Sequence, residues 1–249
     1  MSKFGYMIQV GNLNDMVMKS IHTFLQSNED AQLFFYTISN LTEGIENLVD
    51  NSRIKVIELK EEDWLNKMMY CKIKTILNFY DELQEGDEVL VLDTDLIFKS
   101  DPFEVFSSND FDVFVTSRHY YYHYSVNAGV WGFVKNKKTD KFILDFVNQI
   151  TNPTYEPLLK FRQRFNRDDS LNWWVDQDYL CVVYEENLKN KNKNIELFDA
   201  GYRYNFCAST DILGIDRAVE EVRDALNSPH IKIIHLKADL KNYFVEMLK

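Results

Sequence analysis

The sequence predicts an α/β fold in a single domain, with a mostly parallel sheet flanked by helices. In the first half of the chain, short apolar runs typical of buried strands alternate with longer segments of helical periodicity. The 249 residues, 45% of them hydrophobic, suffice to build one large core. No Pro/Gly-rich linker and no internal repeat divides the sequence, so one domain is expected.

Seven apolar runs are predicted to form strands. They are Gly5–Val10, Leu33–Ile38, Lys55–Leu59, Glu88–Leu92, Asp112–Thr116, Gly129–Phe133 and Lys232–His235. Strands that alternate with helices favour a doubly wound sheet, because each helix crosses back over the sheet between parallel strands. Ligands of such sheets bind outside the carboxyl ends of the strands. Polar residues that directly follow a predicted strand are therefore the first candidates for a site.

Helical patterns connect these runs. Asn14–Gln26 and Trp64–Leu83 carry apolar stripes at helical spacing, and Asp140–Ile150 is also predicted to be a helix. The charged residues 135–138 predict a turn, and 151–172 shows no clear pattern. Asn187–Asn194, which consists mainly of Asn and Lys, is expected to be a solvated loop.

Charge and cysteine usage argue against several classes of protein. A formal net charge of -11 leaves no basic surplus for coating nucleic acid. The widely spaced Cys71, Cys181 and Cys207 fit neither a disulfide framework nor a CxxC zinc site, which indicates a reducing compartment. The sequence shows no signal peptide and no apolar run of about 20 residues. We therefore expect a cytoplasmic protein without a membrane span.

The strongest motif is Asp93-Thr94-Asp95, which directly follows the apolar run of Val89–Leu92. Two carboxylates at this spacing can reach one cation if the chain turns between them. Mg²⁺ and Mn²⁺ prefer such oxygen ligands and commonly share them with substrate phosphates. The alternative is a loop with two solvated aspartates, but a position at the end of a buried strand favours the metal.

His235 ends the last predicted strand in the same manner. Its neutral imidazole could complete the coordination of the same cation, or it could cap the strand through a hydrogen bond. Lys237 and Lys241 follow His235 and could neutralise a phosphate, or they could be ordinary surface cations.

Two further segments have side chains suited to a sugar. Asn127 offers donors and acceptors to hydroxyl groups, and Gly129 allows close approach of backbone to a ligand. Asp176, Gln177 and Asp178 follow two tryptophans and combine carboxylates with an amide. Asp176 could equally be the N-cap of a helix.

In their order along the chain, these segments resemble the GT-A glycosyltransferases of family eight, the glycogenin and galactosyltransferase-like group. The matching stretches are Lys72–Phe106, Asn127–Phe133, Asp176–Gln177, Tyr204–Asn205 and His235–Lys241. The resemblance implies a GT-A, Rossmann-like fold with a nucleotide-binding half (1–100) and an acceptor-binding half (101–249). It also implies transfer of a sugar from a nucleoside diphosphate sugar, with a UDP-sugar favoured. The acceptor would be a hydroxyl group of a glycan, glycoprotein or small molecule, and the configuration would be retained.

The resemblance assigns roles residue by residue. It implies that Asp93, Asp95 and His235 bind Mn²⁺ or Mg²⁺, which bridges the donor phosphates, and that Lys241 contacts the same diphosphate. The rest of the implied donor site consists of Gln9, Val10, Gly11, Asn12, Lys72, Thr94, Asn127 and Gly129. Asp176, Gln177 and Asp178 are the catalytic candidates, because they match or adjoin the Asp-Gln pair of the family. The segment Arg118–Tyr124 has no counterpart and either covers the acceptor or forms surface aromatics.

Three other functions remain open at this point. An inverting GT-A transferase would use Asp176 or Asp178 as the general base for the acceptor hydroxyl. A nucleotidyltransferase would usually have a basic, Gly-rich loop after the first strand, and Gly11–Asp15 contains neither Arg nor Lys. A non-catalytic module that binds nucleotide sugars is the third alternative.

Overall fold

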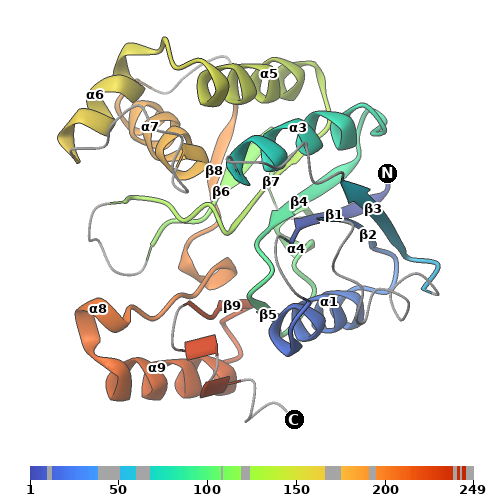
Figure 1. The fold of residues 1–249 in the computed structure, drawn as a ribbon, viewed down its shortest axis with the longest axis vertical. Helices are drawn as coiled ribbons and strands as arrows, with labels where there is room; N and C mark the ends of the chain where they lie inside the picture. The colour runs from blue at the N-terminus through green and yellow to red at the C-terminus, as the bar shows by residue number, and fades with distance from the viewer. Residues whose placement is uncertain are drawn as a thin grey trace.

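A computed structural model gives the fold of the chain and describes residues 1–9, 13–38, 51–59, 68–107, 109–118, 124–165, 175–190, 195–237, 240–241 and 243–244 (Figure 1). The strands are β1 (Lys3–Ile8), β2 (Gln32–Ile38), β3 (Ile54–Leu59), β4 (Glu88–Leu92), β5 (Leu96–Phe98), β6 (Val113–Val115), β7 (Val130–Val134), β8 (Leu197–Asp199) and β9 (Ile233–His235). The helices are α1 (Asp15–Ser27), α3 (Met68–Tyr80), α4 (Glu104–Ser107), α5 (Lys137–Thr151), α6 (Glu156–Arg164), α7 (Val175–Asn190), α8 (Thr210–Leu213) and α9 (Ile215–Asn227), and a 3-10 turn spans Tyr202–Tyr204.

Seven of the strands form one sheet in the order β3-β2-β1-β4-β7-β6-β8. Neighbouring strands run parallel except for β7, which is antiparallel to both β4 and β6. The predicted mostly parallel α/β sheet is therefore confirmed. The last predicted strand lies outside this sheet, because β9 pairs with β5 in a separate antiparallel ribbon in which Leu96 faces His235.

Strand β4 shows why the central strands appear in the sequence as continuous apolar runs. Alternate side chains of a strand point to opposite faces of its sheet. Val89 and Val91 belong to the core that includes residues of α3, α5 and α7, whereas Leu90 and Leu92 belong to the core that includes residues of α1. Figure 1 shows these helices on the two sides of the sheet. Because both faces are covered, neither can carry solvated polar groups.

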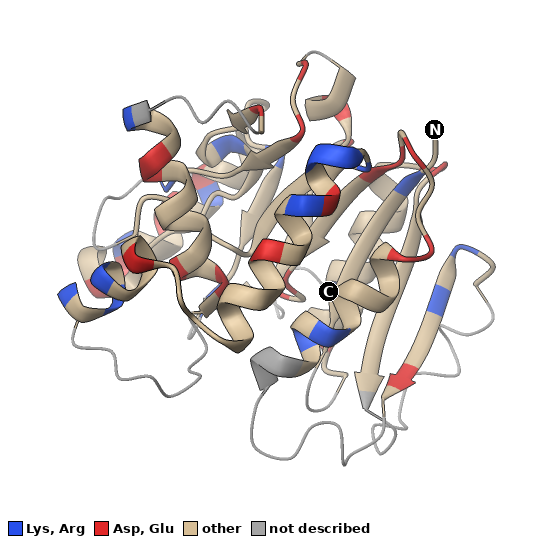
Figure 2. Ribbon diagram, turned by 90° about the horizontal axis from the view of Figure 1, so that it is seen from above, with Lys and Arg blue, Asp and Glu red and all other residues tan. Residues whose placement is uncertain are grey.

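Charged residues lie mainly on the helices, the loops and the ends of the strands (Figure 2). This distribution leaves the sheet apolar, so the polar groups that it does bury need a specific explanation. Along the described part of the chain, no helix has the length and apolar character needed to cross a membrane.

The structure corrects two of the local predictions. Helix α5 begins at Lys137, because the Asn136 side chain caps it by accepting hydrogen bonds from the backbone N–H groups of Lys138 and Thr139. The predicted turn therefore ends at Asn136. The predicted loop at Asn187–Asn194 is wrong up to Asn190, where α7 ends, and 191–194 lie outside the described residues.

Two helices arise where the sequence pattern is weak. Helix α6 lies in the segment that shows no clear periodicity. The run Tyr179–Val182 in α7 is entirely buried, so this helix faces protein on several sides and presents no simple apolar stripe.

Candidate functional site

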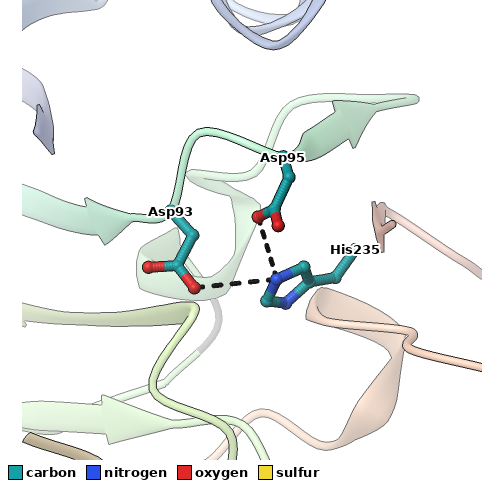
Figure 3. Close-up of side chains that lie close together, drawn as sticks. All are labelled: Asp93, Asp95 and His235. Carbon is teal, nitrogen blue, oxygen red and sulfur yellow. Dashed lines mark ion pairs between the residues drawn. The ribbon is translucent and has the colours of Figure 1, made fainter. Parts of the chain in front are cut away.

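Three side chains gather where β4 ends and β5 begins (Figure 3). Asp93 directly follows β4, Asp95 directly precedes β5, and His235 is the last residue of β9. One ligand atom from each lies within 4.8 Å of the others. Nε2 of His235 is 2.9 Å from Oδ1 of Asp95 and 3.6 Å from Oδ2 of Asp93. The predicted turn between the two aspartates brings both carboxylates to the same imidazole.

Backbone hydrogen bonds hold this turn on both sides. The backbone N–H of Asp93 donates to the carbonyl of Gly129, which directly precedes β7. The N–H of Leu236 donates to the carbonyl of Asp95, which extends the pairing of β5 with β9. The main sheet therefore fixes Asp93, and the small ribbon fixes Asp95 and His235.

Gly129 makes room for the imidazole. A Cβ atom added here would lie 2.3 Å from Cε1 of His235 and 2.9 Å from Oδ2 of Asp93, distances at which atoms overlap. The sequence suggested that Gly129 lets backbone approach a ligand. The structure shows that it lets backbone approach His235, a contact that no local pattern reveals.

Asn205 determines how His235 presents its nitrogens. The Asn205 amide NH₂ donates to the Thr116 hydroxyl and to the carbonyl of Asn127, so its oxygen points to Nδ1 of His235 at 3.0 Å. Since Nδ1 must donate to that oxygen, the neutral ring carries its lone pair on Nε2, which faces the two aspartates. Asn205 appears in the sequence resemblance, but its role as a support of His235 was not predicted.

The resulting geometry fits a divalent cation. Nε2 of His235 and Oδ1 of Asp95 are both buried, and neither has a hydrogen-bond partner. Two lone pairs that face each other at 2.9 Å repel unless a proton or a cation lies between them. In an octahedral Mg²⁺ site with bonds of 2.0–2.1 Å, adjacent ligand atoms stand about 3 Å apart. The carboxylates suit Mg²⁺ or Mn²⁺ in type, and the 2.9 Å between His235 and Asp95 matches the spacing of adjacent ligand atoms.

Two lysines border this cluster. Nζ of Lys241 lies 2.7 Å from Oδ2 of Asp95. Burial alone would raise the pKa of Asp95, but its interactions with His235 and with the ammonium group of Lys241 outweigh burial and hold this pKa well below its usual range. Nζ of Lys72 lies 2.7 Å from Oδ2 of Asp176 and 3.5 Å from Oδ1 of Asp93. Burial lowers the pKa of Lys72, but the carboxylates of Asp176 and Asp93 raise it above its usual value, so Lys72 stays charged.

Other residues of the predicted donor site lie around this centre. The Thr94 hydroxyl donates to the side-chain oxygen of Gln9 at 2.5 Å, which ties the turn to the end of β1. The Asn127 side-chain oxygen accepts from the N–H of Gly129, whereas its buried NH₂ group has no partner. The predicted nucleotide contacts at 10–12 lie outside the described residues.

The three catalytic candidates occupy the first turn of α7 and differ in their surroundings. Asp176 lies inside the helix, so its interpretation as an N-cap is wrong, and it contacts Lys72 beside the aspartate cluster. The side-chain oxygen of Gln177 accepts a hydrogen bond from Arg118 at 3.2 Å. Asp178 forms a buried ion pair of 3.6 Å with Arg162 of α6. Asp176 thus shares Lys72 with Asp93.

No model of a known protein family matches this sequence, and no curated protein matches it. Solved structures do match. The glycosyltransferase GlyE of Streptococcus pneumoniae has a TM-score of 0.57 at 16% identity, over 96% of this chain and 55% of GlyE. The chain therefore spans about half the length of GlyE.

Two further structures match this chain over nearly their whole length. The galactosyltransferase LgtC, solved in complex with donor and acceptor sugar analogues, has a TM-score of 0.55 at 15% identity, over 98% of this chain and 93% of LgtC. Mouse xyloside xylosyltransferase 1 has a TM-score of 0.56 at 12% identity, over 94% of this chain and 97% of that protein. Together with the sheet topology, these likenesses show that the chain has the GT-A fold of glycosyltransferases.

Proposed function

We propose that this protein is a metal-dependent glycosyltransferase. It moves a sugar from a nucleoside diphosphate sugar, with a UDP-sugar favoured, to the hydroxyl group of an acceptor, with retention of configuration at the anomeric carbon. The single observation that carries the proposal is the pair of buried, unpartnered acceptor atoms on His235 and Asp95, next to Asp93. A fold can host many activities, so this site supports the proposal more strongly than the fold does.

The proposed cation is Mn²⁺ or Mg²⁺, held by Asp93, Asp95 and His235. The imidazole favours Mn²⁺, since nitrogen ligands bind it more readily than they bind Mg²⁺. When bound, the cation supplies a Lewis acid that offsets the negative charge on the departing diphosphate. Lys241, beside Asp95, supplies a second positive charge and N–H donors to the same phosphates.

The residues on the other side of Asp93 are proposed to handle the sugar. Lys72 holds the carboxylate of Asp176 in one place, so that this group can position the acceptor or stabilise positive charge on the reacting sugar. The buried NH₂ group of Asn127 is a free donor for a sugar hydroxyl. In this proposal, the half that contains residues 1–100 holds the nucleotide, and the half that contains 101–249 holds the acceptor.

The ion pairs of α7 favour retention over inversion. An inverting enzyme needs a free carboxylate to take the proton of the acceptor hydroxyl. Asp178 is buried against Arg162, and Asp176 is engaged by Lys72. Both candidate bases are therefore already paired with a cation, which supports the retaining mechanism.

A ligand screen tests the proposal. UDP-sugars and GDP-sugars are added with and without Mn²⁺, and the melting temperature is measured together with release of the free nucleoside diphosphate. We expect stabilisation by one donor class only when Mn²⁺ is present, because a ligand that binds the native state raises stability by about 2.7 kcal/mol at 100 times its Kd. Full donor turnover in EDTA would overturn the metal-dependent mechanism. NMR of the product then reports whether the anomeric configuration is retained.

The screen and a second assay, which contains nucleoside triphosphates and sugar phosphates, separate the alternative functions. A nucleotidyltransferase would release pyrophosphate from a nucleoside triphosphate and a sugar phosphate. A non-catalytic module would bind a nucleotide sugar with Mn²⁺ but would release no free diphosphate. The proposed location is cytoplasmic, because the odd number and wide spacing of the cysteines favour a reducing compartment.

A further inference from the structure

Three basic side chains contact three consecutive residues in the first turn of α7. The pairs are Lys72 with Asp176, Arg118 with Gln177, and Arg162 with Asp178. Lys72 and Arg162 each form an ion pair with a carboxylate, whereas Arg118 forms a hydrogen bond with a neutral amide. The first turn of this helix therefore carries one positive charge without a balancing negative charge.

Arg118 has no acidic partner anywhere in the described part of the chain. One of its terminal nitrogens donates to Gln177, and the guanidinium carbon lies 5.2 Å from the centre of the Tyr124 ring. The Nε atom is buried and has no hydrogen-bond partner. Burial lowers the pKa of Arg118, although an arginine stays protonated in proteins. In a chain with a formal net charge of -11, a largely buried cation without a counter-ion is costly and needs a reason.

Gln177 adds a second donor without an acceptor. Its side-chain oxygen is used by Arg118, while its buried NH₂ group has no partner. Nε of Arg118 and the NH₂ group of Gln177 are thus both N–H donors for which no described residue supplies an acceptor. A carboxylate or a phosphate presents several acceptor oxygens and a negative charge to such donors. The first turn of a helix adds a favourable field for the same charge.

The missing anion is distinct from the donor diphosphate. The diphosphate is assigned to the cluster of Asp93, Asp95 and His235, where Lys241 also lies. Among the described residues, Arg118 makes no ion pair with Asp93 or Asp95, and its side-chain hydrogen bond goes to Gln177 in the first turn of α7. Arg118 therefore faces a group other than the diphosphate.

We propose that Arg118 and Gln177 form a subsite for an acidic group, a carboxylate or a phosphate, carried by the sugar acceptor. This inference rests on the proposed function, because it assigns the region beside Asp176 to the acceptor. The acceptor class is then an acidic sugar, such as a uronic acid or a sugar phosphate, rather than a neutral one.

Three sugars that differ only at carbon 6 test the subsite. Glucose, glucuronate and glucose 6-phosphate are titrated into the protein with saturating Mn²⁺ and UDP or GDP, whichever the screen selects. Ligand-observed NMR gives the Kd of each. We expect at least one acid to bind about tenfold more tightly than glucose, as for one charge-assisted contact. The preferred acid distinguishes a carboxylate acceptor from a phosphate acceptor.

Arg118→Gln should remove the preference for the acid and leave the Kd of the nucleoside diphosphate unchanged. Arg118→Lys, which keeps the charge, should retain part of the preference and serves as the second variant if the glutamine variant does not fold. Arg217→Gln is the matched control, since that side chain is 60% exposed on α9 and should change nothing.

The outcomes distinguish the two proposals. If Mn²⁺ and every nucleotide sugar fail to bind, the proposed function is wrong. If the nucleotide binds with Mn²⁺ but the three sugars bind equally or not at all, the acidic subsite is wrong. A preference for the acid that is undiminished in Arg118→Gln, or in Arg118→Lys if the glutamine variant does not fold, also overturns the assignment.

Discussion

Lys72 and Asp176 form a buried ion pair of 2.7 Å although they lie 104 residues apart in the chain. The pair joins α3 to the first turn of α7, and Lys72 also lies 3.5 Å from Asp93. The contact thus sets the distance between the proposed metal ligands and the proposed catalytic turn. Its side chains are only 13% and 6% exposed, so neither charge can be satisfied by water if the other is lost.

Lys72→Met should therefore destabilise the fold. Removing one partner of a buried ion pair typically lowers the free energy of unfolding by about 3–5 kcal/mol. Urea denaturation measures this loss. The matched control is Lys160→Met, because Lys160 and Glu156 form a largely exposed ion pair. This variant should lower the free energy of unfolding far less. Equal losses for the two variants would show that the Lys72–Asp176 pair is not effectively buried.

Asp95→Asn should remove the metal site without unfolding the protein. The amide has the shape of the carboxylate but lacks its charge, so we expect the affinity for Mn²⁺ and the rate of donor hydrolysis to fall by about 100-fold or more. Titration of Mn²⁺ followed by electron paramagnetic resonance measures the affinity. Asp211→Asn changes an exposed carboxylate on α8 and should leave both quantities unaltered. Unchanged Mn²⁺ binding in the Asp95 variant would contradict the assignment of this ligand.

Gly129→Ala should displace the imidazole of His235. The added Cβ would lie 2.3 Å from Cε1 and 2.6 Å from Nδ1 of the ring, so either the ring or β7 must move. Such overpacking costs about 1–3 kcal/mol, and here it should also weaken Mn²⁺ binding. Gly132→Ala is the comparison, because its Cβ would instead meet the carbonyl oxygen of Val89 and the ring of Phe114. We expect Gly132→Ala to lower the melting temperature while the folded protein keeps its Mn²⁺ affinity.

Asn205→Ala should weaken metal binding although Asn205 is not a proposed ligand. Nδ1 of His235 would lose the acceptor that fixes its tautomer, and loss of such a support typically costs 10- to 100-fold in affinity, by an order-of-magnitude estimate. Asn205→Asp keeps an oxygen for Nδ1 but loses the NH₂ donors to Thr116 and Asn127, so it should recover part of that loss. Asn227→Ala, which removes only a contact with the backbone of Arg223 at the end of α9, is the control. Equal Mn²⁺ affinity in the Ala and Asp variants would contradict this role.

The sequence was sufficient to predict the position of the metal candidates. Asp93 and His235 each stand at the end of an apolar run, and such runs are strong local signals of buried strands. The rule that ligands bind beyond the ends of strands in this class of sheet applies to Asp93. Because β9 lies outside the main sheet, His235 was grouped with Asp93 through the family resemblance and the similar end of its apolar run. The mostly parallel sheet followed from the same runs.

The remaining contacts leave no local signal. β5 has only three residues and begins directly after Asp95, so its pairing with β9 could not be inferred from periodicity. Some contacts join residues that are far apart in sequence: Asn205 with His235, Arg118 with Gln177, and Arg162 with Asp178. Polarity at one position does not indicate which distant group satisfies it, so these partners required the structure.

The pairing of Leu96 with His235 in the β5–β9 ribbon has a consequence for synthesis of the protein. Contacts between residues far apart in sequence form late, because closing a long stretch of chain costs entropy before any contact repays it. On the ribosome, the carboxylates of Asp93 and Asp95 emerge long before the imidazole that shares their cluster. A nascent chain with its first strands already paired would therefore bind Mn²⁺ weakly, and tight metal capture would mark the completed molecule.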